Sequence, residues 1–196
     1  SEASQLIEEQ LAEEGVQIYL NTHADEFLII ENAKYLKVIK EGTLYKLPFD
    51  DVMVAVGRKP NVEGFGLEEL ALSMRENGSI ETNQFLETNY PNVFACGDVT
   101  GPYRLTHMAS HQAWYCSVNA LIGKFKKFKV DYRVVPWCTY TDPEVATVGM
   151  NEKMLKEKKM DYEITFFDLK ELDRAIVDGE TRGFVKIITA KGKDKI

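Results

Sequence analysis

Residues 87–106 constrain the fold of this chain more than any other segment. They read as a short apolar strand, residues 93–96, which ends at Gly97-Asp98 and leads through a Gly-Pro loop to a helix from Thr106. Glycine lets the backbone approach a ligand closely, and aspartate accepts hydrogen bonds from ligand hydroxyls. The first turn of the helix presents free N–H groups and partial positive charge. This arrangement suits a cofactor that carries phosphates or hydroxyls, although Gly-Asp pairs are also common in ordinary turns.

Two further segments carry recognisable motifs. Residues 50–61 read DDVMVAVGRKPN, in which residues 52–56 form the continuous apolar run of a strand buried in a parallel sheet. Gly57 ends this run, and Pro60 favours an extended exit. Residues 135–149 read VPWCTYTDPEVATVG, which predicts two strands joined by an Asp-Pro turn.

These segments, with FACGDV at residues 94–99, resemble the pyridine nucleotide–disulfide oxidoreductases, a family that includes lipoamide dehydrogenase, glutathione reductase and mercuric reductase. THMASHQA at 106–113 and LDRAIVDGETRGFVK at 172–186 resemble the mercuric-reductase-like branch most. The resemblance implies an α/β and α+β fold, with partial nucleotide-binding (Rossmann-like) domains followed by an α+β dimerisation domain. It divides the chain into the C-terminal half of an NAD(P)-binding domain (1–57), the C-terminal part of an FAD-binding domain (58–129) and a truncated dimerisation domain (130–196).

The residue pattern predicts the elements within each piece. The first piece has a helix over 4–14 with Ser4 as a possible N-cap, and strands over 16–20, 27–30, 35–39, 44–47 and 52–56. The second has an Asn77-Gly78 reversal, the strand over 93–96, and a helix from His107 to about Leu121 that Gly123 ends. The third has strands over 133–140, 145–149, 162–167 and 183–190, a helix capped by Asn151, and a helical or loop segment over 171–177.

The resemblance also implies which residues hold cofactors. Asp98, beside Gly97, would bind the ribityl hydroxyls of FAD, and the segment Arg104, Leu105, Thr106 and His107 would bring helix-terminal N–H groups to the flavin ring. Ala24 and Gly57 would line the NAD or NADP cofactor through their backbones. Thr106 also reads as a simple N-cap, the His107 side chain as a structural first-turn residue, and Ala24 as a loop residue without contacts.

The family's reactive groups are not found in this sequence. It has no G-x-G-x-x-G loop, no C-x-x-x-x-C pair and no C-terminal His and Glu pair. We therefore expect an internal piece of a longer enzyme that contains no catalytic residue, holds FAD weakly or not at all, and is inactive alone. The cysteines Cys96, Cys116 and Cys138 are spaced too widely for a redox motif, and we interpret them as buried free thiols in a reducing cytoplasm.

The implied parent chemistry is hydride transfer from NAD(P)H through flavin to a cysteine pair, and from there to a small-molecule disulfide or a metal ion such as Hg(II). The implied assembly is a homodimer. Two alternatives remain open, a flavoprotein without a dithiol such as an NADH oxidase, and a non-catalytic dimerisation module. Within the sequence His107 and His111 lie one helical turn apart, but no third ligand completes a metal site.

Charge and hydropathy exclude other classes of function. A net charge of −7 and a pI near 5.1 argue against a nucleic-acid-binding surface. The sequence contains no run of about 18 apolar residues, so it predicts no membrane-spanning helix. The localisation that we expect, the cytoplasm, follows from the cysteine pattern given above.

Overall fold

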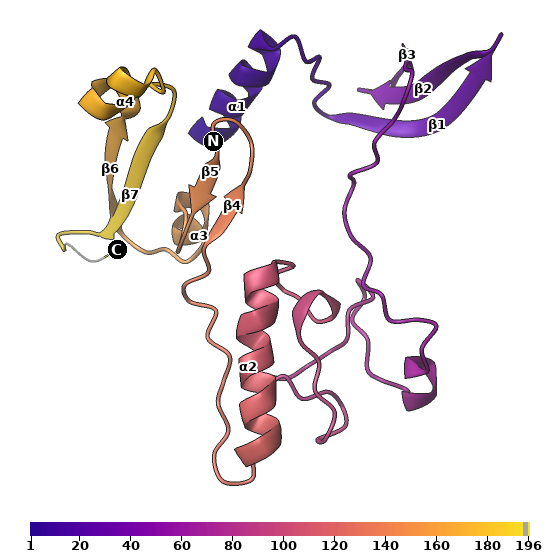
Figure 1. Cartoon of the computed structure of the whole chain (residues 1–196), viewed down its shortest axis with the longest axis vertical. Helices are drawn as coiled ribbons and strands as arrows, with labels where there is room; N and C mark the ends of the chain where they lie inside the picture. The colour runs from indigo at the N-terminus through magenta and orange to yellow at the C-terminus, as the bar shows by residue number, and fades with distance from the viewer. Residues whose placement is uncertain (194–195) are drawn as a thin grey trace. The chain divides into compact units, whose positions relative to one another are not determined.

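The computed structural model describes residues 1–193 and 196 of the chain (Figure 1). The chain divides into two compact units, Ser1–Gly57 and Arg58–Ile196. Both contain helices and small antiparallel sheets, so the predicted mixture of helix and strand is confirmed.

The first unit begins with helix α1, Glu2–Glu13. Its N-cap is Ser1, whose side chain accepts a hydrogen bond from the Ser4 N–H at 3.3 Å. The prediction of Ser4 as the cap was therefore wrong, because an equally good cap residue precedes it by one turn. The chain leaves the helix through Gly15 at φ +85°, a conformation that favours glycine.

A three-stranded antiparallel sheet follows in the order β1-β2-β3 (Figure 1). Two-residue turns connect its strands, and the first turn has positive φ at both Glu31 and Asn32, which matches the twist of a hairpin. Val38 on the central strand is the buried residue of the sheet, with 3% of its surface exposed. The predicted strands over 27–30, 35–39 and 44–47 are confirmed, with bounds β1 Thr22–Ile30, β2 Ala33–Lys40 and β3 Thr43–Pro48.

Two predicted strands of this unit are not formed. Residues 16–20 and 52–56 lie outside the strands of the described chain. Met53 and Val56 are 89% and 92% exposed, respectively. The prediction was wrong because an apolar run becomes a strand only where a neighbouring strand supplies hydrogen-bond partners, and no described strand pairs with these residues.

The second unit has the long helix α2, Thr106–Ile122, which confirms the predicted helix. Met108, Gln112 and Asn119 are its buried residues and recur at helical spacing on one face. Asn119 uses its whole amide: its nitrogen donates to the carbonyls of Phe85 at 3.0 Å and Phe128 at 2.9 Å, and its oxygen accepts from the Phe128 N–H at 2.8 Å. This buried amide fastens the segments before and after α2 to the helix.

The predicted strand over 93–96 is an extended segment with a single bridge between Glu87 and Phe94. It does not form a strand because its backbone N–H and C=O groups form hydrogen bonds with loops and with α2, and not with a neighbouring strand. The Ala95 N–H, for example, donates to the Leu86 carbonyl at 3.1 Å. Short 3-10 helices lie at η1, Leu67–Leu70, and η2, Gly97–Val99. The predicted reversal at Asn77-Gly78 is confirmed, since Gly78 has φ +75° and Met74 bridges Ile80.

The C-terminal part contains two antiparallel pairs, β4 with β5 and β6 with β7. The predicted strand over 133–140 shortens to β4 because Pro136 cannot donate to a ladder and the strand starts after it. The side chain of Asn151 accepts from the Met154 N–H at 3.0 Å, which confirms this residue as the cap of α3. The bounds are β4 Trp137–Thr139, β5 Val145–Thr147, α3 Glu152–Glu157, β6 Tyr162–Asp168, η3 Leu169–Glu171, α4 Asp173–Asp178 and β7 Phe184–Ala190.

Among the described residues, no helix combines the length and the apolar character that crossing a bilayer requires.

Candidate functional site

The Gly97-Asp98 turn lies directly against α2. Gly97 is buried and has φ +79°. A Cβ atom added to it would lie 3.2 Å from the Cβ of Ala109, which is tighter than ordinary contact. Only glycine therefore combines this backbone conformation with this close approach to the helix.

Gln112 holds the turn on the helix. Its side chain is fully buried, and its Oε1 accepts from the Gly97 N–H at 2.5 Å. Its Nε2 donates to the Gly101 carbonyl at 3.1 Å and to the Tyr132 hydroxyl at 2.8 Å. The sequence reasoning missed this residue. Its position four residues after Met108, on the apolar face of the helix, was the signal that a buried polar group stands there.

A second buried side chain closes the loop after the turn. The Thr100 hydroxyl lies within hydrogen-bond distance of the Gly97 carbonyl at 3.3 Å and the Gly101 carbonyl at 3.1 Å. The Arg75 guanidinium donates to the Thr100 carbonyl. The Ile80 N–H donates to the Val99 carbonyl at 2.7 Å. The turn is thus fixed by bonds that leave the Asp98 carboxylate on the outside.

Asp98 pairs with Arg58, which the sequence reasoning did not assign to the site. Arg58 Nη1 lies 3.3 Å from Asp98 Oδ2 and 3.4 Å from the Arg104 carbonyl. The Arg104 guanidinium donates in return to the Arg58 carbonyl. The side chains of Asp98 and Arg58 are 44% and 70% exposed, so this is a surface pair that orients the carboxylate without enclosing it.

The first turn of α2 has no side-chain cap. Leu105 is the N-cap residue, with extended backbone at φ −129° and ψ 137°, and it makes no capping bond. Thr106 is the first helical residue, so its prediction as the N-cap was wrong: the chain enters the helix one residue earlier. Thr106 and His107 are exposed, which leaves the positive end of the helix dipole open to a ligand.

Both histidines of α2 make structural bonds to backbone carbonyls. The Nε2–H of His107 donates to the Pro136 carbonyl at 2.7 Å, and that of His111 donates to the Asp131 carbonyl at 3.1 Å. The structural interpretation of the His107 side chain agrees with this bond. In the part of the chain that the structure describes, no group of three or more His, Cys, Asp or Glu side chains is placed to hold a metal ion.

Ala24 and Gly57, the residues predicted to line the nicotinamide cofactor, lie in the first unit. Ala24 is exposed on β1 opposite Val38, beside an irregularity in the strand register. Gly57 is exposed at φ +132°. The role of Ala24 and Gly57 in holding NAD or NADP stays a prediction.

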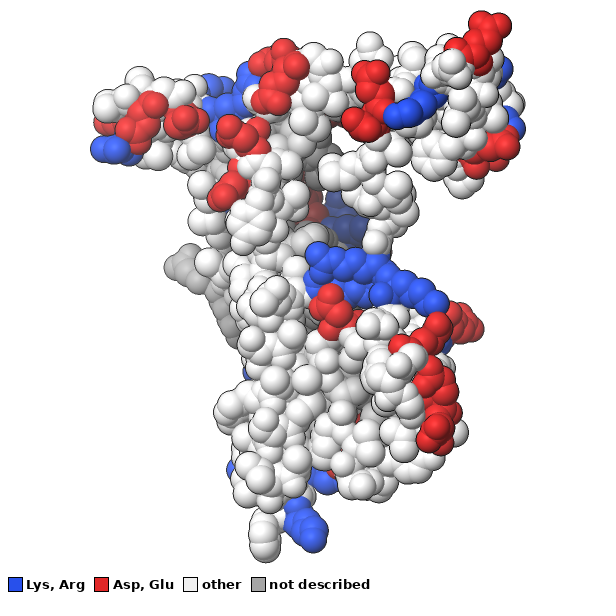
Figure 2. Space-filling view, turned by 45° about the vertical axis from the view of Figure 1, so that its right-hand side comes forward, with Lys and Arg blue, Asp and Glu red and all other residues white. Residues whose placement is uncertain are grey.

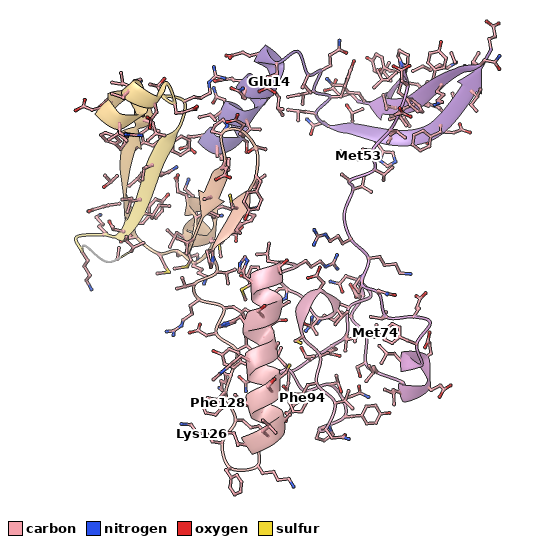
Figure 3. All side chains as sticks on the ribbon, viewed as in Figure 1. Glu14, Met53, Met74, Phe94, Lys126 and Phe128 are labelled. Atoms are coloured by element: carbon pink, nitrogen blue, oxygen red, sulfur yellow. The ribbon has the colours of Figure 1, made fainter. Side chains whose placement is uncertain are left out.

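On the face shown in Figure 2, acidic and basic side chains lie beside one another and wide areas carry neither. In Figure 3, Phe128 lies beside the C-terminal half of α2, where Lys126 Nζ stands 5.2 Å from the centre of its ring. Lys126 therefore contacts an aromatic ring two residues along its own chain.

Comparison with known proteins gives two family matches. Residues 1–113 match the pyridine nucleotide-disulphide oxidoreductase family, and residues 135–196 match the dimerisation domain of the same family. The relatives include dihydrolipoyl dehydrogenase of Buchnera aphidicola subsp. Acyrthosiphon pisum, 35% identical over 91% of this chain and 37% of its own length. Mercuric reductase of Staphylococcus aureus is 33% identical over 100% of this chain and 35% of its own length.

The solved structures agree with these matches. The HOCl-induced flavoprotein disulfide reductase RclA of Escherichia coli has a TM-score of 0.80 at 28% identity, over 95% of this chain and 42% of that one. LpdA of Mycobacterium tuberculosis has a TM-score of 0.83 at 23% identity, over 98% of this chain and 41% of that one, which supports the fold alone. The chain thus spans less than half the length of these relatives.

Proposed function

This chain belongs to the pyridine nucleotide-disulphide oxidoreductase family, and from that premise we propose that it forms part of an FAD-dependent NAD(P)H:disulfide or mercuric ion oxidoreductase. Bound FAD would supply a carrier of electrons between the nicotinamide cofactor and a cysteine pair outside this chain. The residues of this chain would bind and orient that group. The chain would contain no catalytic residue of its own.

The observation that carries the proposal is the Gly97-Asp98 turn held beside the uncapped start of α2. Gln112 and Thr100 fix the turn, so the half-exposed Asp98 carboxylate can accept hydrogen bonds from ribityl hydroxyls. The open N–H groups of Thr106 and His107 suit an electron-rich ligand edge, since the helix dipole stabilises negative charge there.

Arg58 and Arg104 would position the Gly97-Asp98 turn and the start of α2. Their reciprocal bonds to each other's carbonyls tie the segment after Gly57 to the segment before α2. Arg58 also restrains the Asp98 carboxylate. Ala24 and Gly57 would serve NAD or NADP through their backbone groups. The boundaries 1–57, 58–129 and 130–196 remain our assignment of the domains.

The substrate would be a small-molecule disulfide or a metal ion such as Hg(II), because a dihydrolipoyl dehydrogenase and a mercuric reductase match the chain comparably well. Soft thiolates suit both kinds of reaction. Residues 135–196 would supply a homodimer interface, as expected from the family of their matched domain.

The test is flavin retention and turnover in the complete enzyme that contains this chain. We expect yellow dimers that oxidise NADH or NADPH with a disulfide or Hg(II) as acceptor. Asp98→Ala should weaken FAD binding about tenfold, since hydrogen bonds to a charged group contribute at least about 1.5 kcal/mol. The exposed Asp161→Ala serves as the matched control and should retain flavin as the parent does.

Other outcomes identify the alternatives. Colourless dimers would indicate a non-catalytic dimerisation module, and flavin-bound dimers that reduce only oxygen would indicate an NADH oxidase. Unchanged flavin affinity in Asp98→Ala would contradict the assigned role of the carboxylate. The 196-residue chain alone should lose FAD during gel filtration.

A further inference from the structure

The extended segment before the Gly97-Asp98 turn runs along one face of α2. The Cys116 thiol donates to the Ala95 carbonyl at 3.8 Å, and the Gly97 N–H donates to Gln112 Oε1 at 2.5 Å. Gly97 also approaches Ala109, where an added Cβ would be 3.2 Å away. Positions 109, 112 and 116 are three and four residues apart, so they share a single helix face.

The extended segment and α2 therefore run antiparallel to each other. This places Cys96 beside the part of the helix face that carries Cys116. Cys96 lies between Ala95, bonded to Cys116, and Gly97, bonded to Gln112 one turn earlier in the helix. The Cys96 side chain is also near enough to Cys116 to raise the pKa of its thiol. Both are half-buried free thiols, so a small oxidant can reach them. We propose that Cys96 and Cys116 form an intramolecular disulfide when the protein is exposed to a peroxide.

The environment of the two sulfurs sets the order of events. Burial, and then the nearby Cys96 sulfur, raises the pKa of the Cys116 thiol to about 12. Peroxide is attacked by thiolates, and the raised pKa keeps the proton on Cys116. Cys116 is therefore the less reactive sulfur, and we assign the first attack to Cys96.

The reaction balances with peroxide as the two-electron oxidant. The Cys96 thiolate attacks one peroxide oxygen, the O–O bond breaks, and Cys96 becomes a sulfenic acid while hydroxide leaves. The Cys116 sulfur then attacks the Cys96 sulfur, the S–O bond breaks, and the Cys116 proton leaves with the hydroxyl as water. The product ties the end of the extended segment to α2, one residue before the Gly97-Asp98 turn.

Tryptic mapping tests this proposal cleanly, because Arg75, Arg104, Lys124, Arg133 and Lys153 place the three cysteines on separate peptides, 76–104, 105–124 and 134–153. After treatment of the 196-residue chain with hydrogen peroxide, the denatured protein should fall from three titratable thiols to one. The first two peptides should appear as a cross-linked pair, and dithiothreitol should release them.

Three variants sharpen the result. Cys138→Ser is the matched control and should form the same cross-link, with its thiols falling from two to none. Cys116→Ser should stop at a Cys96 sulfenic acid that dimedone traps, and Cys96→Ser should form no link between peptides 76–104 and 105–124. The proposal fails if the unmodified chain keeps all its thiols at a dose that oxidises free glutathione. It also fails if the link joins Cys138 or a second chain, or if Cys96 passes to the sulfinic acid while Cys116 stays reduced.

Discussion

At the scale of single residues, the buried amide of Gln112 connects helix α2 to the turn that carries Asp98. Its oxygen and nitrogen together bond to Gly97, Gly101 and Tyr132. A side chain with these partners fixes the loop on the helix, since without it the buried Gly97 N–H would lack a hydrogen-bond partner.

Replacement of Gln112 by alanine should lower the free energy of unfolding by about 3 kcal/mol. It leaves the buried Gly97 N–H and the half-buried Tyr132 hydroxyl without this partner, at about 1–3 kcal/mol for a buried group. Urea unfolding followed by tryptophan fluorescence is the measurement, and it reports the second unit because Trp114 and Trp137 both lie there. Ser117→Ala, at an exposed position of the same helix, should shift stability by less than about 0.5 kcal/mol. Equal stability of the two variants would contradict the structural role of Gln112.

Glu87 links stability to pH in the same unit. Lys127 at 2.6 Å and the Asn83 amide at 2.8 Å hydrogen-bond to its carboxylate, and they lower its pKa below the usual 4.5. A carboxyl whose folded pKa is lowered stabilises the fold above its unfolded pKa, and this contribution is lost as the pH falls through the folded value.

Glu87→Gln should therefore be less stable than the parent at pH 7, and the difference should shrink as the pH falls below about 4.5. Urea midpoints at pH 7 and at successively lower pH values measure the effect. The exposed Glu76→Gln is the matched control, and its midpoints should follow the parent at each pH. A Glu87→Gln gap that stays constant or widens toward acid would show that the charge of Glu87 does not provide the stability.

At the scale of elements, the sequence pattern predicted an element correctly where its hydrogen-bond partners are close to it in sequence. The meander over β1 to β3 follows from alternating strands and two-residue turns, and both are readable in the sequence. Residues 52–56 failed as a strand because a strand of this kind depends on partners distant in sequence. The Gly97-Asp98 turn was found from its residue types, whereas Gln112 and Arg58 were missed because only the folded chain brings them to it.

The cap of α3 is an element-scale feature that the sequence predicted correctly. Asn151 accepts from the Met154 N–H at 3.0 Å and satisfies one of the free donors of this six-residue helix. Asn151→Ala should cost about 1 kcal/mol of stability, while Asn151→Ser keeps a capping oxygen and should cost much less. Urea unfolding of both variants decides the matter. Equal losses would mean that Asn151 acts through something other than its cap bond.

At the scale of the whole molecule, we expect the segment between the sheet and the second unit to open most easily. Residues 52–56 belong to no strand or helix, and Met53 and Val56 are almost fully exposed. Segments with few backbone bonds and little burial open at low free energy, and proteases cut at such places first. The same residues are apolar, so they suit an elastase that cleaves after small aliphatic side chains.

Brief elastase digestion should therefore cut the chain within residues 52–56 and leave two fragments that correspond to Ser1–Gly57 and Arg58–Ile196 within a few residues. Mass spectrometry of the early products gives the cut sites. A variant with Val52, Val54, Ala55 and Val56 replaced by aspartate should be cut there much more slowly, because the protease loses its preferred side chains while the exposed backbone remains. First cuts inside β1 to β3 or within α2 would instead place the least stable backbone inside a unit, and the boundary at Gly57 would not mark independent folding.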